Sequence, residues 1–248
     1  MMNNLRFLVL VLLNAIWLDA QLISKFQLCS RSDPKFKECL KVAIPKAIAL
    51  LSAGIPDLNI PSIDPMKFAE FEAPKIPPLT FDQKYTNIEV HGHTKGDVVE
   101  DIDASLTDTD FFLSMTILCP EVDFRADYVY ENAIIDGVDY SSKGTTSTMA
   151  FNYLFQANFT GSIIKKDGDD YISITDVDTI SKHVDDMKIT VDADKSDVGN
   201  KLAKLLTDNW ENYITKQKKK YTAIYSEVYK QEANAIFSQI PYKQLFPK

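Results

Sequence analysis

Histidines that could bind a metal ion or transfer protons are few in this chain. His91 and His93 share one face of a predicted strand end, where they could hold a metal ion together with a carboxylate, but two such ligands at a polar turn are usually solvated. His183 lies beside Asp185 and Asp186, like a base with its orienting acid, yet no nucleophile accompanies it. We therefore expect no metal site and a solvated cluster at His183.

Motifs of known enzyme classes are missing from the sequence. It contains no Gly-x-Ser-x-Gly elbow, no phosphate-binding loop and no His-Glu-x-x-His pair. The acidic run Asp167, Asp169 and Asp170 lacks the spacing of a calcium loop and is typical of a turn. We therefore expect a protein without catalytic residues or cofactors, and a hydrolase is the least favoured function.

The overall charge disfavours nucleic acid and anionic membranes as partners. The chain has 248 residues, 45% of them hydrophobic, and a net charge of -8. A phosphate backbone would repel the average face of such a protein. The run Lys216 to Lys220 could contact anionic lipid headgroups, but on a long helix, and interrupted by Gln217, it is typical of a solvated face.

Residues 1–20 are typical of a secretory signal peptide. Arg6 is the basic end, residues 7–13 are the apolar run, and Leu18-Asp19-Ala20 is a plausible cleavage site. A membrane anchor is the alternative, but Asn14 interrupts the apolar run and about 20 residues are needed to span a bilayer. We expect cleavage and an extracellular protein.

The remaining chain, residues 21–248, is expected to form one secreted domain without stable membrane insertion. Export places the three cysteines in an oxidising compartment, and an odd number allows at most one internal disulfide. Cys29 and Cys39 are the expected pair, which would pin the chain onto the helix that follows. Cys119 would remain a free thiol in the core of a strand.

Two helical segments flank the centre of the chain. Asp33 followed by Pro34 is a helix start, and the apolar period predicts a helix to about Leu51 that bends at Pro45. From residue 197 to about 240 the apolar groups again recur at helical spacing, which predicts one long helix or two collinear ones.

Between the helices the apolar period changes to two. Residues 81–192 alternate apolar and polar side chains, and polar reversals such as Asp136-Gly137 separate the runs. This predicts an antiparallel meander of about eight strands with one solvent-exposed face. A sheet of this size must curl or close. Six of the eleven prolines fall between residues 56 and 78, which predicts an extended connector before the sheet.

Four segments resemble the insect takeout and juvenile-hormone-binding family. The first is the cysteine pair at a helix start, and the second is GIPDLNIPSIDP at residues 54–65, which is similar to the family's GIPEL and LDP signature. The third runs from Val198-Gly199 through Leu205-Leu206 to Asn209-Trp210, and the fourth closes the chain with Ile240-Pro241-Tyr242 and Leu245-Phe246-Pro247. The match spans essentially the mature chain.

The resemblance implies an α+β fold in which a strongly curved antiparallel sheet wraps around a long C-terminal helix, as in TULIP domains. An internal hydrophobic tunnel between helix and sheet would hold the ligand. Periodicity alone would favour a filled core for the inner-face residues. The resemblance instead makes them candidates for the tunnel wall: Leu113, Met115, Phe124, Tyr128, Met149, Phe151, Tyr153, Phe155, Leu202, Leu206 and Trp210.

The implied function is a secreted carrier that binds a small lipophilic ligand, such as a juvenile hormone-like terpenoid, a fatty acid or an odorant. The alternative is a secreted signalling or lipid-surface module with a cell-surface receptor, linked to circadian, feeding or chemosensory behaviour. Asn158 lies in the glycosylation sequon Asn158-Phe159-Thr160, on the polar face of its strand, and we expect it to be glycosylated.

Overall fold

The computed structural model describes residues 23–56, 59–194 and 196–248. The expected signal peptide therefore lies outside the described residues. In the part that is described, no helix combines the length and the apolar character needed to cross a membrane.

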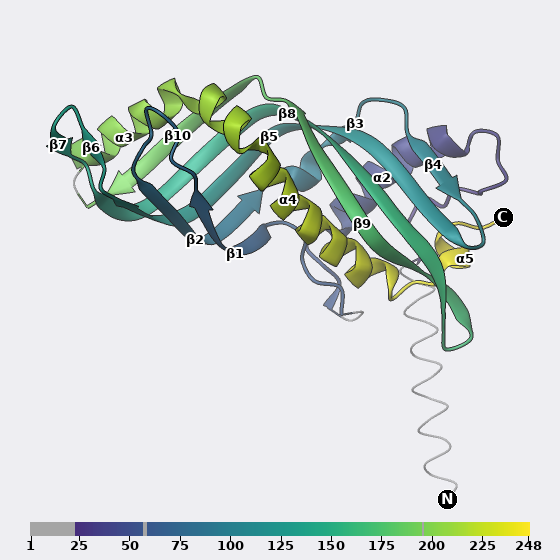
Figure 1. The fold of residues 1–248 in the computed structure, drawn as a ribbon. Coiled ribbons are helices and arrows are strands. Elements are labelled where there is room, and N and C mark those ends of the chain that lie inside the picture. Colours follow the sequence, from purple (N-terminus) through teal and green to yellow (C-terminus); the bar gives the residue numbers. More distant parts are fainter. Residues whose placement is uncertain (1–22, 57–58, 195) are drawn as a thin grey trace, which may run out of the picture.

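Two long strands organise an eight-stranded antiparallel sheet (Figure 1). They are β5 (Asp110–Glu131) and β8 (Ser142–Lys166), which pair along almost their whole length. One half of the pair is flanked by β2, β1 and β10, and the other half by β3, β4 and β9. These strands are β1 (Met66–Ala73), β2 (Asp82–His91), β3 (Asp97–Val98), β4 (Asp103–Leu106), β9 (Asp169–His183) and β10 (Asp186–Ala193).

The predicted antiparallel sheet is confirmed, but its boundaries differ from the prediction in one place. The segment predicted to be a connector contains β1, whose apolar side chains pair with those of β2 between the flanking prolines. The apolar alternation of residues 113–117 and that of residues 122–130 both lie in one strand, β5, which is 22 residues long. The turn at Asp136-Gly137 is present and joins the short strands β6 (Ile134–Ile135) and β7 (Val138–Asp139).

A crease crosses β5 and β8 near their centres. Cys119 and Val122 are both buried although they are an odd number of residues apart, so β5 changes its inner face at Pro120. Opposite this point, Asn152 of β8 has a left-handed backbone with φ of 49°. Pairing continues in the same register, with Cys119 opposite Tyr153, so both strands change face together. Only the pair of Pro120 and Asn152 is missing from the ladder, so the sheet changes face at the crease while the pairing on both sides is kept.

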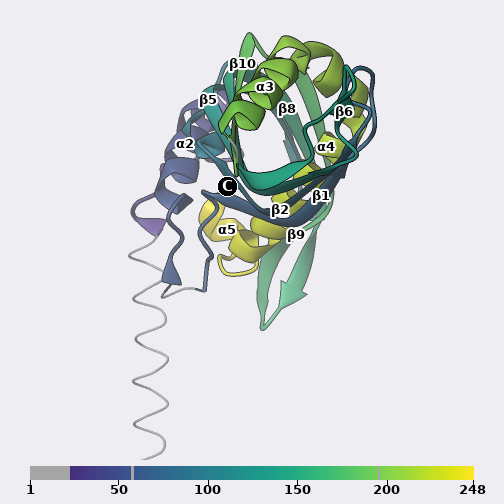
Figure 2. The ribbon, with the colours of Figure 1, turned by 90° about the vertical axis from the view of Figure 1, so that its left-hand side faces the viewer.

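Helices α3 (Ser196–Asp208) and α4 (Trp210–Phe237) lie in the curve of the sheet (Figures 1 and 2). The prediction was one long helix or two collinear ones; two helices are present, with Asn209 as the N-cap of α4, and Figure 1 shows that they are not collinear. Gly199 lets α3 approach β10, because a Cβ at this position would lie 2.6 Å from the carbonyl oxygen of Val191. Each half of the sheet thus receives its own helix, α3 on β10 and α4 on β9.

Helix α2 (Phe36–Leu51) closes the other end of the molecule and contains Pro45. It begins two residues after Pro34, and the Asp33 carboxylate accepts a hydrogen bond of 2.8 Å from the backbone N–H of Lys35. The expected disulfide joins Cys29 to Cys39 and ties the preceding segment to this helix. The short helix α5 (Tyr242–Leu245) follows Pro241, which is its N-cap residue.

Candidate ligand-binding cavities

The larger internal cavity, which we call the α2 cavity, has a volume of about 220 Å³. It lies between α2, the end of α4, α5 and the sheet, toward the right-hand end of Figure 1. Leu40, Ala43 and Ala47 contribute the apolar face of α2, and Leu113 and Met115 of β5 form part of the facing wall. Space remains between α2 and the curved sheet because Ala43 and Ala47, on the facing side of α2, have small side chains.

A second cavity of about 110 Å³, which we call the junction cavity, lies where α3 meets α4. Leu206 and Trp210 line it from the helices, and Val122, Phe124 and Ala150 line it from the two long strands. The sheet side of the junction cavity is therefore formed by the part of β5 after the crease and the part of β8 before it.

Aromatic side chains separate the two cavities. Tyr153 and Tyr225 line the junction cavity, whereas Phe155 and Tyr229 line the α2 cavity. The ring centroids lie 5.3 Å apart for Tyr153 and Phe155, 6.1 Å for Phe155 and Tyr229, and 6.2 Å for Tyr225 and Tyr229. We call this group of four rings, which lies between the two cavities, the aromatic partition.

Tyrosine hydroxyls give the junction cavity a polar end. The hydroxyls of Tyr85 and Tyr130 lie 3.0 Å apart, and Tyr85 and Tyr213 donate to the Gln83 side-chain oxygen at 3.1 and 2.9 Å. Burial raises the pKa of Tyr213 to about 12. These phenols are therefore neutral hydrogen-bonding groups at physiological pH.

A buried histidine lies in the wall of the α2 cavity. His93, expected to be solvated at a turn, is 8% exposed, and its Nε2 donates to the Ile63 carbonyl oxygen at 2.6 Å. Burial lowers its pKa, so the ring is neutral. His91 instead contacts Glu89 at 3.2 Å. The two histidines thus have different partners, and the described residues contain no group of three metal-ligating side chains.

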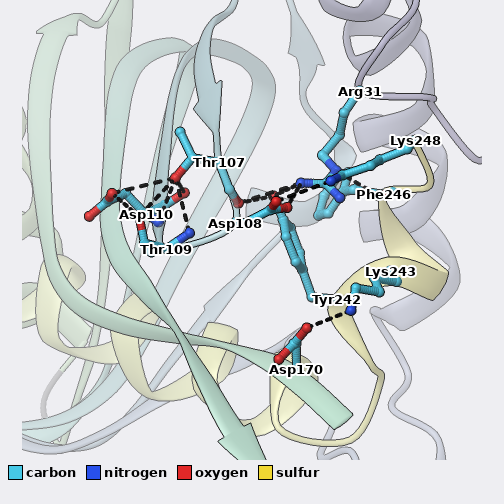
Figure 3. Close-up of polar contacts among 10 residues, drawn as sticks. All are labelled: Arg31, Thr107, Asp108, Thr109, Asp110, Asp170, Tyr242, Lys243, Phe246 and Lys248. Atoms are coloured by element: carbon cyan, nitrogen blue, oxygen red, sulfur yellow. Dashed lines mark hydrogen bonds and ion pairs between the residues drawn. The ribbon is translucent and has the colours of Figure 1, made fainter.

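The C-terminal segment contributes Leu245 and Phe246 to the wall of the α2 cavity. Figure 3 shows the polar contacts that hold this segment. Arg31 donates to the Phe246 carbonyl oxygen at 2.9 Å and to the Tyr242 hydroxyl at 3.0 Å, and its guanidinium lies 4.5 Å from the centre of the Tyr242 ring. Tyr242 in turn donates to the Thr107 carbonyl oxygen at 2.9 Å. Because Phe246 lines the cavity, this cluster holds one of its walls in place.

Comparison with known proteins identifies the family. The sequence profile of the haemolymph juvenile hormone binding protein family matches residues 7–247. The chain belongs to this family. The crystal structure of Takeout 1 from Epiphyas postvittana is similar over 90% of this chain and 100% of its own, with 12% sequence identity and a TM-score of 0.72. The predicted fold, a curved antiparallel sheet around a long helix, is confirmed by this match.

The similarity to other known proteins is weaker. Lipopolysaccharide binding protein has 12% identity over 73% of this chain and 37% of its own, with a TM-score of 0.34. No curated protein gives a significant match to the sequence.

Most of the tunnel candidates predicted for this juvenile hormone binding protein family member lie at the cavities or beside them. Leu113, Met115 and Phe155 line the α2 cavity. The junction cavity is lined by four others, namely Phe124, Tyr153, Leu206 and Trp210. Tyr128 and Leu202 are 1% and 0% exposed and belong to the packed core next to the junction cavity.

Met149 and Phe151 line neither cavity. Before the crease, Thr146, Thr148 and Ala150 face the junction cavity, so the odd-numbered residues of this half of β8 are on the other face. Met149 pairs with Asp123, which binds Arg125 and Ser147 there. The alternation predicted from Met149 to Phe159 therefore runs across Asn152, where β8 changes face.

The cavity walls also contain residues that the alternation of the strands did not indicate. The apolar face of α2 was visible from its helical period, but nothing in the sequence showed that it would face a space rather than a packed core. Two polar residues of the α2 cavity also escaped prediction: His93 was expected to be solvated and Glu232 was not singled out, because the burial of each depends on tertiary packing.

Asn158 lies on β8 with its side chain engaged by neighbours. Its amide oxygen accepts from Ser114 at 2.6 Å and from Gln156 at 2.9 Å, and its amide nitrogen donates to Asp178 at 3.4 Å. Glycosylation at this position stays a prediction. Cys119 is buried, and burial raises the pKa of its thiol to about 12.

Proposed function

We propose that this protein is a secreted, non-enzymatic carrier that holds a small lipophilic ligand in its internal cavities. The observation that carries the proposal is the α2 cavity, about 220 Å³ of space walled almost entirely by apolar side chains. Apolar cavities of about 150 Å³ bind small aromatic molecules and exclude water. Removing apolar ligand surface from water contributes about 25 cal/mol per Å², so no chemistry on the ligand is required.

The family and the fold support this function. Family membership favours a juvenile hormone-like terpenoid, and a fatty acid or an odorant has the same apolar character. The tyrosine hydroxyls of the junction cavity would orient the polar end of a ligand that reaches them. The disulfide between Cys29 and Cys39 favours an oxidising, extracellular location.

Binding of an apolar fluorescent probe, N-phenyl-1-naphthylamine, tests the proposal. Ala47 lines the α2 cavity, whereas Ala49 is exposed on the same helix and does not. Ala47→Phe should fill the space and weaken binding about tenfold or more, and Ala49→Phe should bind like the wild type. Trp210 lines the junction cavity, so its emission reports on binding there.

Two results would contradict the carrier function. One is the absence of saturable binding by the probe, farnesol and fatty acids in the delipidated wild type. The other is equal probe affinity in Ala47→Phe and Ala49→Phe, which would place the probe outside the α2 cavity.

A further inference from the structure

Glu232 is an unusual group in the wall of the α2 cavity. The polar side chains of that wall are Gln27, His93, Thr94, Tyr229 and Glu232. Every other side chain of the wall is apolar or belongs to the disulfide. A carboxyl group in such surroundings loses its hydrogen bonds to water, and a hydrogen-bond partner must replace them.

Three of the other polar groups already have partners. The ring of His93 donates to Ile63, as described above. Thr94 donates to the Asp64 carboxylate at 2.6 Å, and the Gln27 oxygen accepts from Lys46 at 3.0 Å. Their hydrogen-bonding capacity is therefore largely used within the protein.

Glu232 and the Tyr229 hydroxyl make no hydrogen bond and no ion pair within the described residues. They are three residues apart on α4 and thus lie on the same side of the helix, one turn from each other. The cavity wall therefore presents two adjacent polar groups whose hydrogen bonds a guest can complete.

The charge around Glu232 decides which guest fits. The titratable groups near it are Tyr229 on α4, His93 before β3, and Asp64 before β1, while α2, α5 and the strands contribute apolar side chains to the cavity. Burial, and secondarily the negative charge of Asp64, raises the pKa of Glu232 to about 8. At neutral pH its carboxyl is mostly protonated, so it both donates and accepts a hydrogen bond.

We infer that the ligand of the α2 cavity is a neutral lipid with a hydroxyl, ketone or ester oxygen, which binds Glu232 while its hydrocarbon part fills the apolar space. This inference rests on the proposed carrier function and adds the ligand class to it. An ionised fatty acid is disfavoured, because its carboxylate would lose its hydration next to Asp64 and a second acid without gaining a cation.

Displacement of N-phenyl-1-naphthylamine by ligands of matched chain length tests the inference. The set is decan-1-ol and 2-undecanone, which carry an oxygen, 1-chlorodecane, which is a poor acceptor, and decanoate, which is an anion. At pH 6.5 the wild type should prefer the two oxygen-bearing ligands over both others. The preference over 1-chlorodecane should be about tenfold, the equivalent of one buried hydrogen bond.

Variants at Glu232 separate the carboxyl from the rest of the wall. Glu232→Leu should lose the preference for decan-1-ol over 1-chlorodecane and keep affinity for 1-chlorodecane. Glu232→Gln keeps a neutral donor and acceptor and should keep the preference. Between pH 6.5 and 9.5 the wild type should lose affinity for 2-undecanone, because the carboxylate no longer donates, whereas Glu232→Gln should not. Glu227→Leu changes an exposed acid of the same helix and is the matched control.

The outcomes distinguish this inference from the carrier function. If the wild type binds none of the apolar compounds, the carrier function itself fails. If it binds them but Glu232→Leu keeps the wild-type preference and pH profile, the carrier function stands and the role of Glu232 is overturned. Tighter binding of decanoate than of decan-1-ol at pH 6.5 would also overturn it.

Discussion

At the scale of single residues, Glu232 couples the stability of the protein to pH. Its pKa is raised from 4.5 to about 8 in the folded protein, so the folded state keeps a proton that the unfolded chain releases. Such a group favours folding below the unfolded pKa, and this contribution is lost as the pH rises through the folded pKa. The relevant window is therefore between about 4.5 and 8.

Glu232→Gln should remove this pH dependence. We expect the free energy of unfolding of the wild type to fall by roughly 2–4 kcal/mol relative to Glu232→Gln between pH 4.5 and 8.5. Urea unfolding of both proteins across this range measures the difference. Parallel curves would show that the Glu232 carboxyl is hydrated or paired in solution.

At the same scale, Asn152 marks the crease of the sheet. Its φ of 49° is a left-handed conformation that side chains with a Cβ adopt at a cost of about 1 kcal/mol or more, Asn less so than others. Its side chain also donates to Asp185 at 2.6 Å. Any substitution of Asn152 therefore changes both the cost of the left-handed backbone and the hydrogen bond to Asp185.

Asn152→Ala should be less stable than Asn152→Gly by about 1 kcal/mol. Both substitutions remove the hydrogen bond to Asp185, so the difference between them isolates the backbone effect. Chemical denaturation measures it. A more stable Ala variant would mean that the strand is regular at this point in solution.

At the scale of elements, the cluster around Arg31 fastens the C-terminal segment over the α2 cavity. The Arg31 side chain is 8% exposed and contacts Tyr242, Phe246 and Asp108. Removing a buried cation that holds several acceptors leaves those acceptors unpaired, which costs more than the loss of a surface ion pair.

Arg31→Ala should lower the free energy of unfolding by about 2–3 kcal/mol and weaken retention of the probe. Lys204→Ala is the control, because Lys204 is 73% exposed and its partner Asp208 is 53% exposed, so their ion pair is a surface pair and we expect at most about 1 kcal/mol. Equal losses in the two variants would contradict a role of Arg31 in closing the cavity.

The same elements show what the sequence could predict and what it could not. The spacing of apolar residues and the positions of prolines, glycines and turn residues predicted α2, the C-terminal helices and most strands, because amphipathic elements carry their burial pattern in the sequence. The crease escaped prediction, since it replaces one alternation by another without a turn. For this reason the sequence put Met149, Phe151, Tyr153 and Phe155 on one face, whereas in the structure only Tyr153 and Phe155 line a cavity. Whether an apolar wall faces a space or a neighbour depends on the distance between elements, which no local pattern encodes.

At the scale of the whole molecule, the structure is a curved sheet with a helix against each half and a cavity at each helix contact. The aromatic partition between the cavities consists of side-chain rings rather than backbone. Our main proposal is that the α2 cavity binds an apolar ligand.

Crystals grown with 10-bromodecan-1-ol would test this claim most directly, because anomalous scattering locates the bromine without reference to the protein atoms. We expect a bromine peak inside the apolar α2 cavity, between α2, α4 and β5, with the hydroxyl end at Glu232. Bromine peaks confined to the protein surface, with side chains filling the α2 cavity, would contradict it.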